Sequence, residues 1–183
     1  MDNKLVNLLK KGGVAVIPTD TIYGIVGSAL NKKTVEKIYD LRKRVKNKPM
    51  IILISSINDL NKFDIKLTSK QKEFLEKVWP NPVSVVLSCT SKEFEYLHRG
   101  KNSLALRMPK NAWLIGLLKK VGPLVAPSAN FEGEKPSENI DMAKKYFDDN
   151  ITFYIDSGKI NSRPSTLIKL DGNGSYKILR QGE

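Results

Sequence analysis

Polar side chains follow an apolar run near the N-terminus of this 183-residue chain. Val14–Ile17 is typical of a buried strand, and Pro18 ends it because proline cannot donate to the strand ladder. The next residues supply hydroxyl, carboxylate and phenol groups: Thr19, Asp20, Thr21 and Tyr23. Ligands of open α/β sheets bind at strand ends, so the segment predicts a ligand site, with an ordinary polar turn as the alternative.

Three cations form a second candidate group. Arg42, Arg44 and Lys48 follow a predicted helix that Asn31 caps, at its C-terminal end and in the loop beyond it. Cations at this end of a helix complement its dipole, which would be a purely structural role. Guanidinium groups also match phosphate oxygens in bidentate pairs, so the same residues could instead clamp a triphosphate.

A third group belongs to two predicted strands. Alternation along the strand Ser103–Met108 places Ser103, Ala105 and Arg107 on one face. Arg107 could be solvated there, or it could bind a substrate carboxylate through a bidentate pair. Ser128 and Asn130 follow the predicted strand Leu124–Ala126. These small polar residues would allow a ligand to approach closely, although a turn or a cap would use the same residue types.

Several other chemistries are excluded by residue type. The chain has neither a Gly-x-x-x-x-Gly-Lys-Ser/Thr loop nor a Gly-x-Gly-x-x-Gly turn. One histidine and one cysteine cannot build a zinc cluster. His98 lies in the polar segment Ser91–Asn102, where we expect a solvated imidazole, and Cys89 lies in an apolar run, where we expect a buried thiol.

Composition indicates the class of protein, its cellular location and the charge of its ligands. Hydrophobic residues make up 40% of the chain and charged residues 27%, as in ordinary globular proteins. We find no membrane-length apolar run and no signal peptide, so we expect a cytoplasmic protein without membrane contact. The net charge of +12 favours polyanions such as nucleotides or RNA, although a Lys-, Asn- and Ile-rich composition can also reflect codon bias.

Strand and helix patterns alternate along the chain. Helices are predicted after Asp2, Asn31, Thr68, Pro109 and Ser137, at segments with helical apolar spacing. Strands are predicted at 14–17, within 22–30, and at 51–54, 83–88, 103–108, 124–126, 153–155, 166–170 and 176–179. Asp171–Gly174 predicts a hairpin between the last two strands. The pattern predicts an α/β fold, with residues 1–183 as one domain built on a twisted mixed sheet flanked by helices.

Ordered motifs along the chain resemble one protein family. Pro-Thr-Asp-Thr-Ile-Tyr-Gly at 18–24 resembles the signature of the YrdC-type threonylcarbamoyl-AMP synthases. Further matches follow in the family's order: 42–44 with 48–50, 79–84, 103–107, 127–130, 163–166 and 178–180. The resemblance covers nearly the whole chain and implies a YrdC-like fold in its minimal, single-domain form.

The resemblance also implies a reaction. L-threonine, bicarbonate and ATP would give L-threonylcarbamoyl-AMP and pyrophosphate, with Mg²⁺ neutralising the leaving pyrophosphate and no metal ligand assigned to the protein. The product would supply a tRNA-modifying threonylcarbamoyl transferase that acts on adenosine 37. Such a nucleotidyl transfer requires positioning and charge neutralisation, and no covalent catalytic residue is expected.

The resemblance also implies binding roles for the residues of this sequence that match the family's motifs. The resemblance implies ATP binding by six residues: Arg44, Lys48, Ser103, Ser128, Asn130 and Arg180. It implies L-threonine binding by Thr21, Arg107 and Ser165, with Asp20, Tyr23 and Arg42 in support. Arg42 stands where family members often have Lys, and Leu53 stands where some relatives have His. We expect Trp79 to pack in the core.

Two other functions fit the residues. An RNA-binding module of the same fold would use the +12 charge without catalysis, although few aromatic residues offer stacking platforms. An enzyme acting on another carbamoyl donor would resemble the YrdC-like domain of hydrogenase-maturation carbamoyltransferases. A paralogue with another substrate belongs to the same class.

Overall fold

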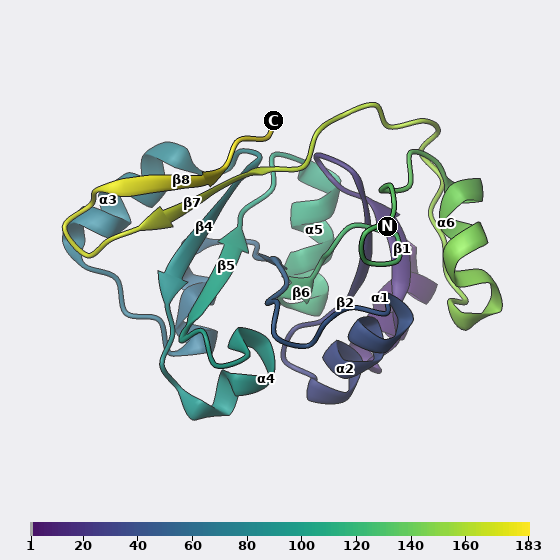
Figure 1. Cartoon of the computed structure of the whole chain (residues 1–183), viewed down its shortest axis with the longest axis horizontal. Coiled ribbons are helices and arrows are strands. Elements are labelled where there is room, and N and C mark those ends of the chain that lie inside the picture. The colour runs from purple at the N-terminus through teal and green to yellow at the C-terminus, as the bar shows by residue number, and fades with distance from the viewer. Residues whose placement is uncertain (1) are drawn as a thin grey trace.

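A mixed sheet of eight strands runs through the computed structural model, which describes residues 2–183. Its strand order is β1-β2-β6-β3-β5-β4-β7-β8. The pairs β3–β5 and β4–β7 are parallel, and the other neighbours are antiparallel. Helices lie on both sides of the sheet (Figure 1). The expected α/β fold with a mixed sheet is therefore confirmed.

The observed elements follow the predicted order. The strands are β1 Ala15–Pro18, β2 Tyr23–Ser28, β3 Ile52–Leu53, β4 Val83–Ser88, β5 Ser103–Arg107, β6 Leu124–Val125, β7 Thr166–Leu170 and β8 Tyr176–Arg180. The α-helices are α1 Asn3–Lys10, α2 Lys32–Leu41, α3 Ser69–Val78, α4 Glu95–His98, α5 Ala112–Val121 and α6 Ile140–Phe147. Three 3₁₀ helices are η1 Ile57–Phe63, η2 Lys92–Phe94 and η3 Asp148–Asn150.

Two apolar cores hold the helices on the sheet. Ala15 and Ile17 of β1 belong to the core that includes Leu5 and Leu9 of α1 and three leucines of α5. Val16, between them in the strand, belongs to the larger core under α2, α3 and α6. This alternation is the period of a strand buried on both faces, and it explains the continuous apolar run in the sequence.

Helix caps fall mostly where the sequence predicts them. The side chains of Asp2, Asn31 and Thr68 each accept a backbone N–H in the first turn of their helix. The helix expected after Pro109 begins at Ala112, because Asn111 accepts the N–H of Leu114. It ends at Gly122, whose φ is +83°.

Ser137 is not the cap of α6. Its hydroxyl instead donates to the carbonyl of Ala129, within the chain that leads away from β6. Asn139 caps the helix and accepts the N–H of Met142 at 2.9 Å. Both residue types cap helices well, and the tertiary contact of Ser137 decides between them.

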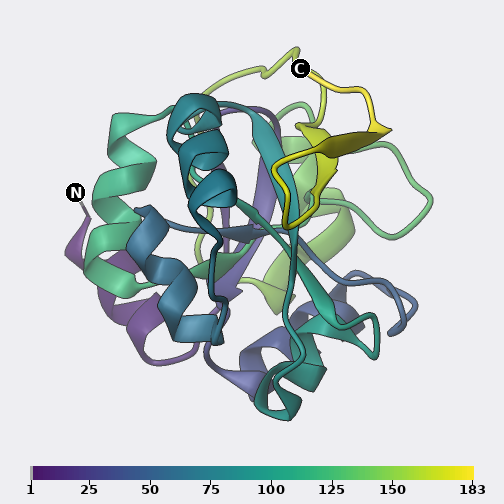
Figure 2. The ribbon, with the colours of Figure 1, turned by 90° about the vertical axis from the view of Figure 1, so that its left-hand side faces the viewer.

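The strand expected at 153–155 is reduced to one bridge. Tyr154 pairs with Val16 in parallel, and two hydrogen bonds of 2.9 Å join Val16 to its neighbours Phe153 and Ile155. The segment therefore extends the β1 edge by one residue pair and forms no ladder. The predicted hairpin of β7 and β8 is confirmed, and it lies beside α3 (Figure 2).

His98 is buried, which corrects the expectation of a solvated imidazole. Only 3% of the residue is exposed, and its Nδ1 accepts the N–H of Gly100 while its Nε2 lies 3.2 Å from the carbonyl of Ser91. His98 is the last residue of the short helix α4, and both of its ring contacts are to the backbone of its own segment. Cys89 and Trp79 are buried, as expected. Within residues 2–183, no helix has the length and apolarity needed to span a bilayer.

Candidate functional site

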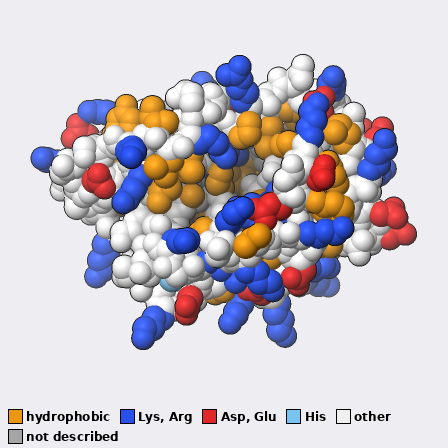
Figure 3. Space-filling model, viewed as in Figure 1, with side chains coloured by type: hydrophobic (Ala, Val, Ile, Leu, Met, Phe, Trp, Pro, Cys, Tyr) orange, Lys and Arg blue, Asp and Glu red, His pale blue; other side chains and the backbone are white. Residues whose placement is uncertain are grey.

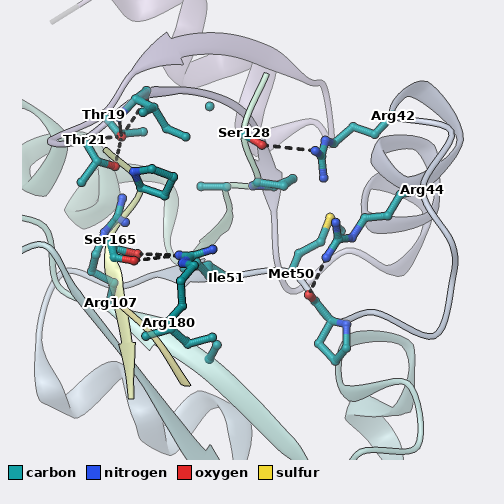
Figure 4. Close-up of a pocket in the computed structure, with 18 residues that line it drawn as sticks. Thr19, Thr21, Arg42, Arg44, Met50, Ile51, Arg107, Ser128, Ser165 and Arg180 are labelled. Atoms are coloured by element: carbon teal, nitrogen blue, oxygen red, sulfur yellow. Dashed lines mark hydrogen bonds between the residues drawn. The ribbon is translucent and has the colours of Figure 1, made fainter. Parts of the chain in front are cut away.

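A polar cavity of about 230 Å³ lies where several predicted segments meet. Its polar lining comes from eight residues: Thr19, Thr21, Arg42, Arg44, Arg107, Ser128, Ser165 and Arg180. Figure 4 shows Arg42 and Arg44 on one side of the cavity and Arg107, Ser165 and Arg180 on the other. In the view of Figure 1, the surface shows Lys and Arg side chains around a hollow that has hydrophobic side chains at its floor (Figure 3).

The turn between β1 and β2 places two hydroxyls in the cavity. Thr19 Oγ1 accepts the N–H groups of Thr21 and Ile22, each at 3.2 Å, and donates to the Ile22 carbonyl at 2.7 Å. The Thr21 hydroxyl lies 3.2 Å from that of Thr19. Thr19 therefore uses its hydroxyl to shape the turn, and Thr21 keeps hydrogen-bonding capacity for a ligand.

Arg107 and Asp20 form a buried ion pair at the end of β5. Arg107 Nη2 lies 3.0 Å from Asp20 Oδ1, and the two side chains are 5% and 4% exposed. Asp20 Oδ2 also accepts the N–H of Lys110 at 3.1 Å. Burial lowers the pKa of Arg107, and the Asp20 charge opposes that effect. Arg107 Nε has no hydrogen-bond partner within residues 2–183 and can donate to an anionic ligand.

Arg42 ties the end of α2 to the chain after β6. Its Nε donates to the Asn130 carbonyl at 3.0 Å, and its Nη2 donates to Ser128 Oγ at 3.2 Å. Only 3% of Arg42 is exposed. Burial and the neighbouring charge of Arg44 lower the pKa of Arg42 to about 10, so it carries its charge at neutral pH. The family resemblance places Lys here, and the guanidinium provides both contacts at once.

Arg44 and Arg180 each brace a loop of the cavity. Arg44 donates to the carbonyls of Lys48 and Pro49 at 3.1 and 3.2 Å. Arg180 donates to the Ser165 carbonyl at 2.7 Å, and burial lowers the pKa of Arg180. Ser165 Oγ lies 2.8 Å from Ser84 Oγ. Both arginines line the cavity while the backbone holds them in place.

The charges in the cavity suit a polyanion. Four arginines line it, and the described lining residues include no Asp or Glu. Preorganised guanidinium groups stabilise phosphate charge as it develops. Within residues 2–183, no group of three or more His, Cys, Asp or Glu side chains is placed to hold a metal ion. The described lining therefore offers no carboxylate ligand to a divalent cation.

Five predicted residues lie outside the cavity lining. Asp20 supports Arg107, and Asn130 supports Arg42. Tyr23 is buried, with its hydroxyl donating to the Gly158 carbonyl at 2.8 Å and accepting the Ser157 N–H at 2.9 Å. The remaining two, Lys48 and Ser103, also do not line the cavity.

Ser103 and Lys48 have other partners in this structure. Ser103 stands at the opposite end of β5 from Arg107, where its hydroxyl donates to the Lys101 carbonyl at 3.3 Å. Lys48 Nζ lies 2.9 Å from a carboxylate oxygen of Glu132. Their roles toward ATP stay predictions.

Residue patterns alone did not assign the apolar part of the cavity. Met50, Ile51, Ala126 and Leu167 line it together with prolines 49, 127 and 164. The apolar run after Lys48 signals only a buried strand, because a ligand wall and a core strand use the same residue types. Thr19 also lines the cavity, although the family resemblance assigns it no binding role.

Known proteins are similar to this chain in sequence and in fold. The family model for Sua5, YciO and YrdC, described as telomere recombination, matches residues 7–182. A Methanocaldococcus jannaschii protein, provisionally named a threonylcarbamoyl-AMP synthase, is 30% identical over 184 residues, covering 98% of this chain and 86% of that protein. The Bacillus subtilis threonylcarbamoyl-AMP synthase is 29% identical over 153 residues, covering 82% of this chain and 44% of the enzyme.

Solved structures agree with the sequence matches. The structure of P. abyssi Sua5 complexed with L-threonine superposes with a TM-score of 0.88 at 26% identity, covering 98% of this chain and 53% of that one. This chain thus spans about half the length of that protein. An open α/β sheet with an arginine-lined cavity at strand ends defines a class of anion-binding α/β domains. Within that class, the chain belongs to the Sua5/YciO/YrdC family.

Proposed function

We propose that this chain is an L-threonylcarbamoyladenylate synthase, a nucleotidyltransferase that uses L-threonine, bicarbonate and ATP. The observation that carries the proposal is the convergence of four arginines and four hydroxyl residues in one cavity that has no carboxylate among its described lining residues. This composition suits a triphosphate beside a small polar amino acid. The names of the relatives from M. jannaschii and B. subtilis support the same activity.

The reaction proceeds through a carbamate. The threonine amine combines with bicarbonate, water is lost, and a carbamate forms. A carbamate oxygen then attacks the α-phosphorus of ATP, the bond to the β-phosphate oxygen breaks, and pyrophosphate leaves with its negative charge. The protein supplies positioning and positive charge for this step.

The cavity residues fall into two groups by ligand in this proposal, and Arg180 belongs to the phosphate group although it lies on the same side as Arg107 and Ser165. Arg42, Arg44 and Arg180 bind the phosphates, with Lys48, Ser103, Ser128 and Asn130 as further predicted contacts. Thr21, Arg107 and Ser165 bind L-threonine. Asp20 holds Arg107, and Tyr23 holds the segment at Ser157 and Gly158. Mg²⁺ accompanies the nucleotide and neutralises pyrophosphate when bound.

The proposal extends to the use of the product. Threonylcarbamoyl-AMP is a mixed anhydride, so a transferase that delivers its acyl group to adenosine 37 of tRNA would consume it. A cytoplasmic setting and direct binding of tRNA belong to the same proposal, and the +12 charge supports the RNA contact.

Pyrophosphate release tests the proposal. The purified protein is incubated with ATP, Mg²⁺ and bicarbonate, with and without L-threonine, and the adenylate is sought by mass spectrometry. We expect pyrophosphate only when threonine and bicarbonate are both present. Folded protein that binds ATP but ignores threonine would indicate a paralogue with another substrate. Folded protein without ATP binding would indicate the RNA-binding module instead.

A further inference from the structure

Acidic side chains from two segments pair with the basic loop beside the cavity: Glu36 and Asp40 of α2 pair with Lys46, and Glu132, which follows β6, pairs with Arg44 and Lys48. The loop from Arg42 to Lys48 contains five cations: Arg42, Lys43, Arg44, Lys46 and Lys48. Like charges this close repel one another, as the effect of Arg44 on the pKa of Arg42 shows. An isolated loop of this composition would spread into solvent, and an anion nearby is needed to hold it together.

Glu132 supplies that anion through both its carboxylate oxygens. One oxygen lies 2.9 Å from Lys48 Nζ and 3.7 Å from Arg44 Nη1. The other accepts the N–H of Val45 at 2.6 Å. The hydrogen bonds from Lys48 and Val45 lower the pKa of Glu132, so it is ionised at neutral pH. A single side chain thereby contacts the middle and the end of the loop.

The backbone of Glu132 contacts the start of the same loop. Its N–H donates to the Arg42 carbonyl at 2.8 Å. Glu132 follows Ser128 and Asn130 in the chain, so the residue joins the two segments that form one side of the cavity. Since Arg44 lines the cavity, the position of the loop determines where its guanidinium lies.

We propose that Glu132 is a positioning residue that anchors the basic loop 42–48 in the arrangement that binds the triphosphate. This inference rests on the proposed function for its ligand. The carboxylate binds the loop at Val45 and Lys48, and its loss leaves Arg44 and Lys48 without their acidic partner, whereas Lys46 keeps Glu36 and Asp40. The loop then opens, and the Arg44 guanidinium is no longer held at the cavity.

Two variants and a matched control separate the contributions. Glu132→Ala removes all side-chain contacts, while Glu132→Gln keeps an oxygen for the Val45 N–H and loses the charge. Glu134→Gln removes the same charge from the same segment. Glu134 is exposed, and within residues 2–183 no hydrogen bond or ion pair involves its side chain.

Limited trypsin digestion tests the anchoring without any ligand. Trypsin can cut after Arg42, Lys43, Arg44 and Lys46, and Pro49 protects Lys48. Cleavage follows the population of the open loop, so we expect Glu132→Ala to be cut there about fivefold faster than the native chain. Glu132→Gln should lie between them, and Glu134→Gln should match the native rate. Equal rates for Glu132→Ala and the native chain would overturn the proposal.

ATP binding and kinetics test the consequence. We expect Glu132→Ala to raise the Kd for ATP about tenfold, as loss of charge-assisted contacts does, and to leave the KM for threonine unchanged. Tighter ATP binding would instead make Glu132 a competitor of the phosphates and overturn the proposal. If the native chain binds no ATP, the proposed function fails, and the trypsin rates alone decide the anchoring.

Discussion

The cavity has two walls of different construction. The strand wall consists of Arg107, Ser165 and Arg180, which stand in or next to strands β5, β7 and β8, and Asp20, which follows β1, supports this wall through its ion pair with Arg107. The loop wall consists of residues 42–49 and 128–132. The ion pair of the strand wall is buried, with side chains 5% and 4% exposed, whereas Lys48 of the loop wall is 57% exposed.

The difference predicts two kinds of failure. A buried charge that loses its partner destabilises the fold, because water cannot replace the missing contact. A half-exposed charge that loses its partner is solvated, so the fold survives and only its ligand contacts suffer. Loss of a partner in the buried Asp20–Arg107 pair should therefore lower stability, and variants of Arg44 and Lys48, which are less buried, should change nucleotide affinity.

Asp20→Asn should show the largest effect. It leaves Arg107 charged and buried, and we expect the free energy of unfolding to fall by about 3 kcal/mol. Urea denaturation measures it. The control is Asp40→Asn, whose carboxylate is 68% exposed and 3.4 Å from Lys46, and which should change stability by less than about 0.5 kcal/mol. Equal stabilities for the two variants would remove the distinction between the walls.

Arg44→Ala tests the loop wall. We expect adenylate formation to fall by about two orders of magnitude, because a preorganised cation at the phosphates is lost. The unfolding transition should stay near that of the native chain. Lys43→Ala is the control, since Lys43 Nζ lies 4.0 Å from the Phe131 ring centre and does not line the cavity. Turnover near the native rate in Arg44→Ala would contradict the phosphate role.

Arg107→Lys sharpens the assignment of substrates to walls. Lysine keeps the charge next to Asp20 but lacks the fork for a bidentate carboxylate. We expect the KM for threonine to rise about tenfold and that for ATP to change little. Steady-state kinetics with each substrate varied in turn provides both values. A larger change for ATP would contradict the assignment of Arg107 to threonine.

The smallest expected effect concerns the pH dependence of the Glu132 contacts. The pKa of Glu132 is lowered below its ordinary value of 4.5 in the folded chain. A lowered carboxyl pKa adds stability above the ordinary value and loses it as the pH falls through the folded value. Glu132→Gln should therefore be less stable than the native chain by less than about 1 kcal/mol at pH 7. Urea titrations at pH 7 and pH 3 should show a smaller difference at pH 3, and a constant difference would contradict the ion-pair origin.

Local signals explain why most elements could be predicted. The caps at Asn31 and Thr68 and the hairpin at Asp171–Gly174 depend on residues a few positions apart. Where two neighbouring residues could each cap the same helix, a contact in the folded structure determined which one does. Ser137 and Asn139 are both good caps, and the contact of Ser137 with Ala129 leaves α6 to Asn139.

The site residues show the same division between what local patterns predict and what tertiary contacts determine. Strand alternation identifies the face that Ser103 shares with Ala105 and Arg107, and only the latter two line the cavity. A period of two residues specifies a face but not a position along the strand. The polar residues around His98 likewise predicted a solvated side chain, whereas His98 is buried in the folded structure.

By itself, the sequence determined the alternation of strands and helices, the caps and the basic and hydroxyl residues at their ends. Tertiary structure decided which of these residues meet. Arg42, Arg107 and Arg180 come from a helix end and two strands, and the order of strands in the sheet brings them to one cavity. Side-chain type and local spacing are properties of neighbouring residues, whereas convergence depends on packing between segments far apart in the chain.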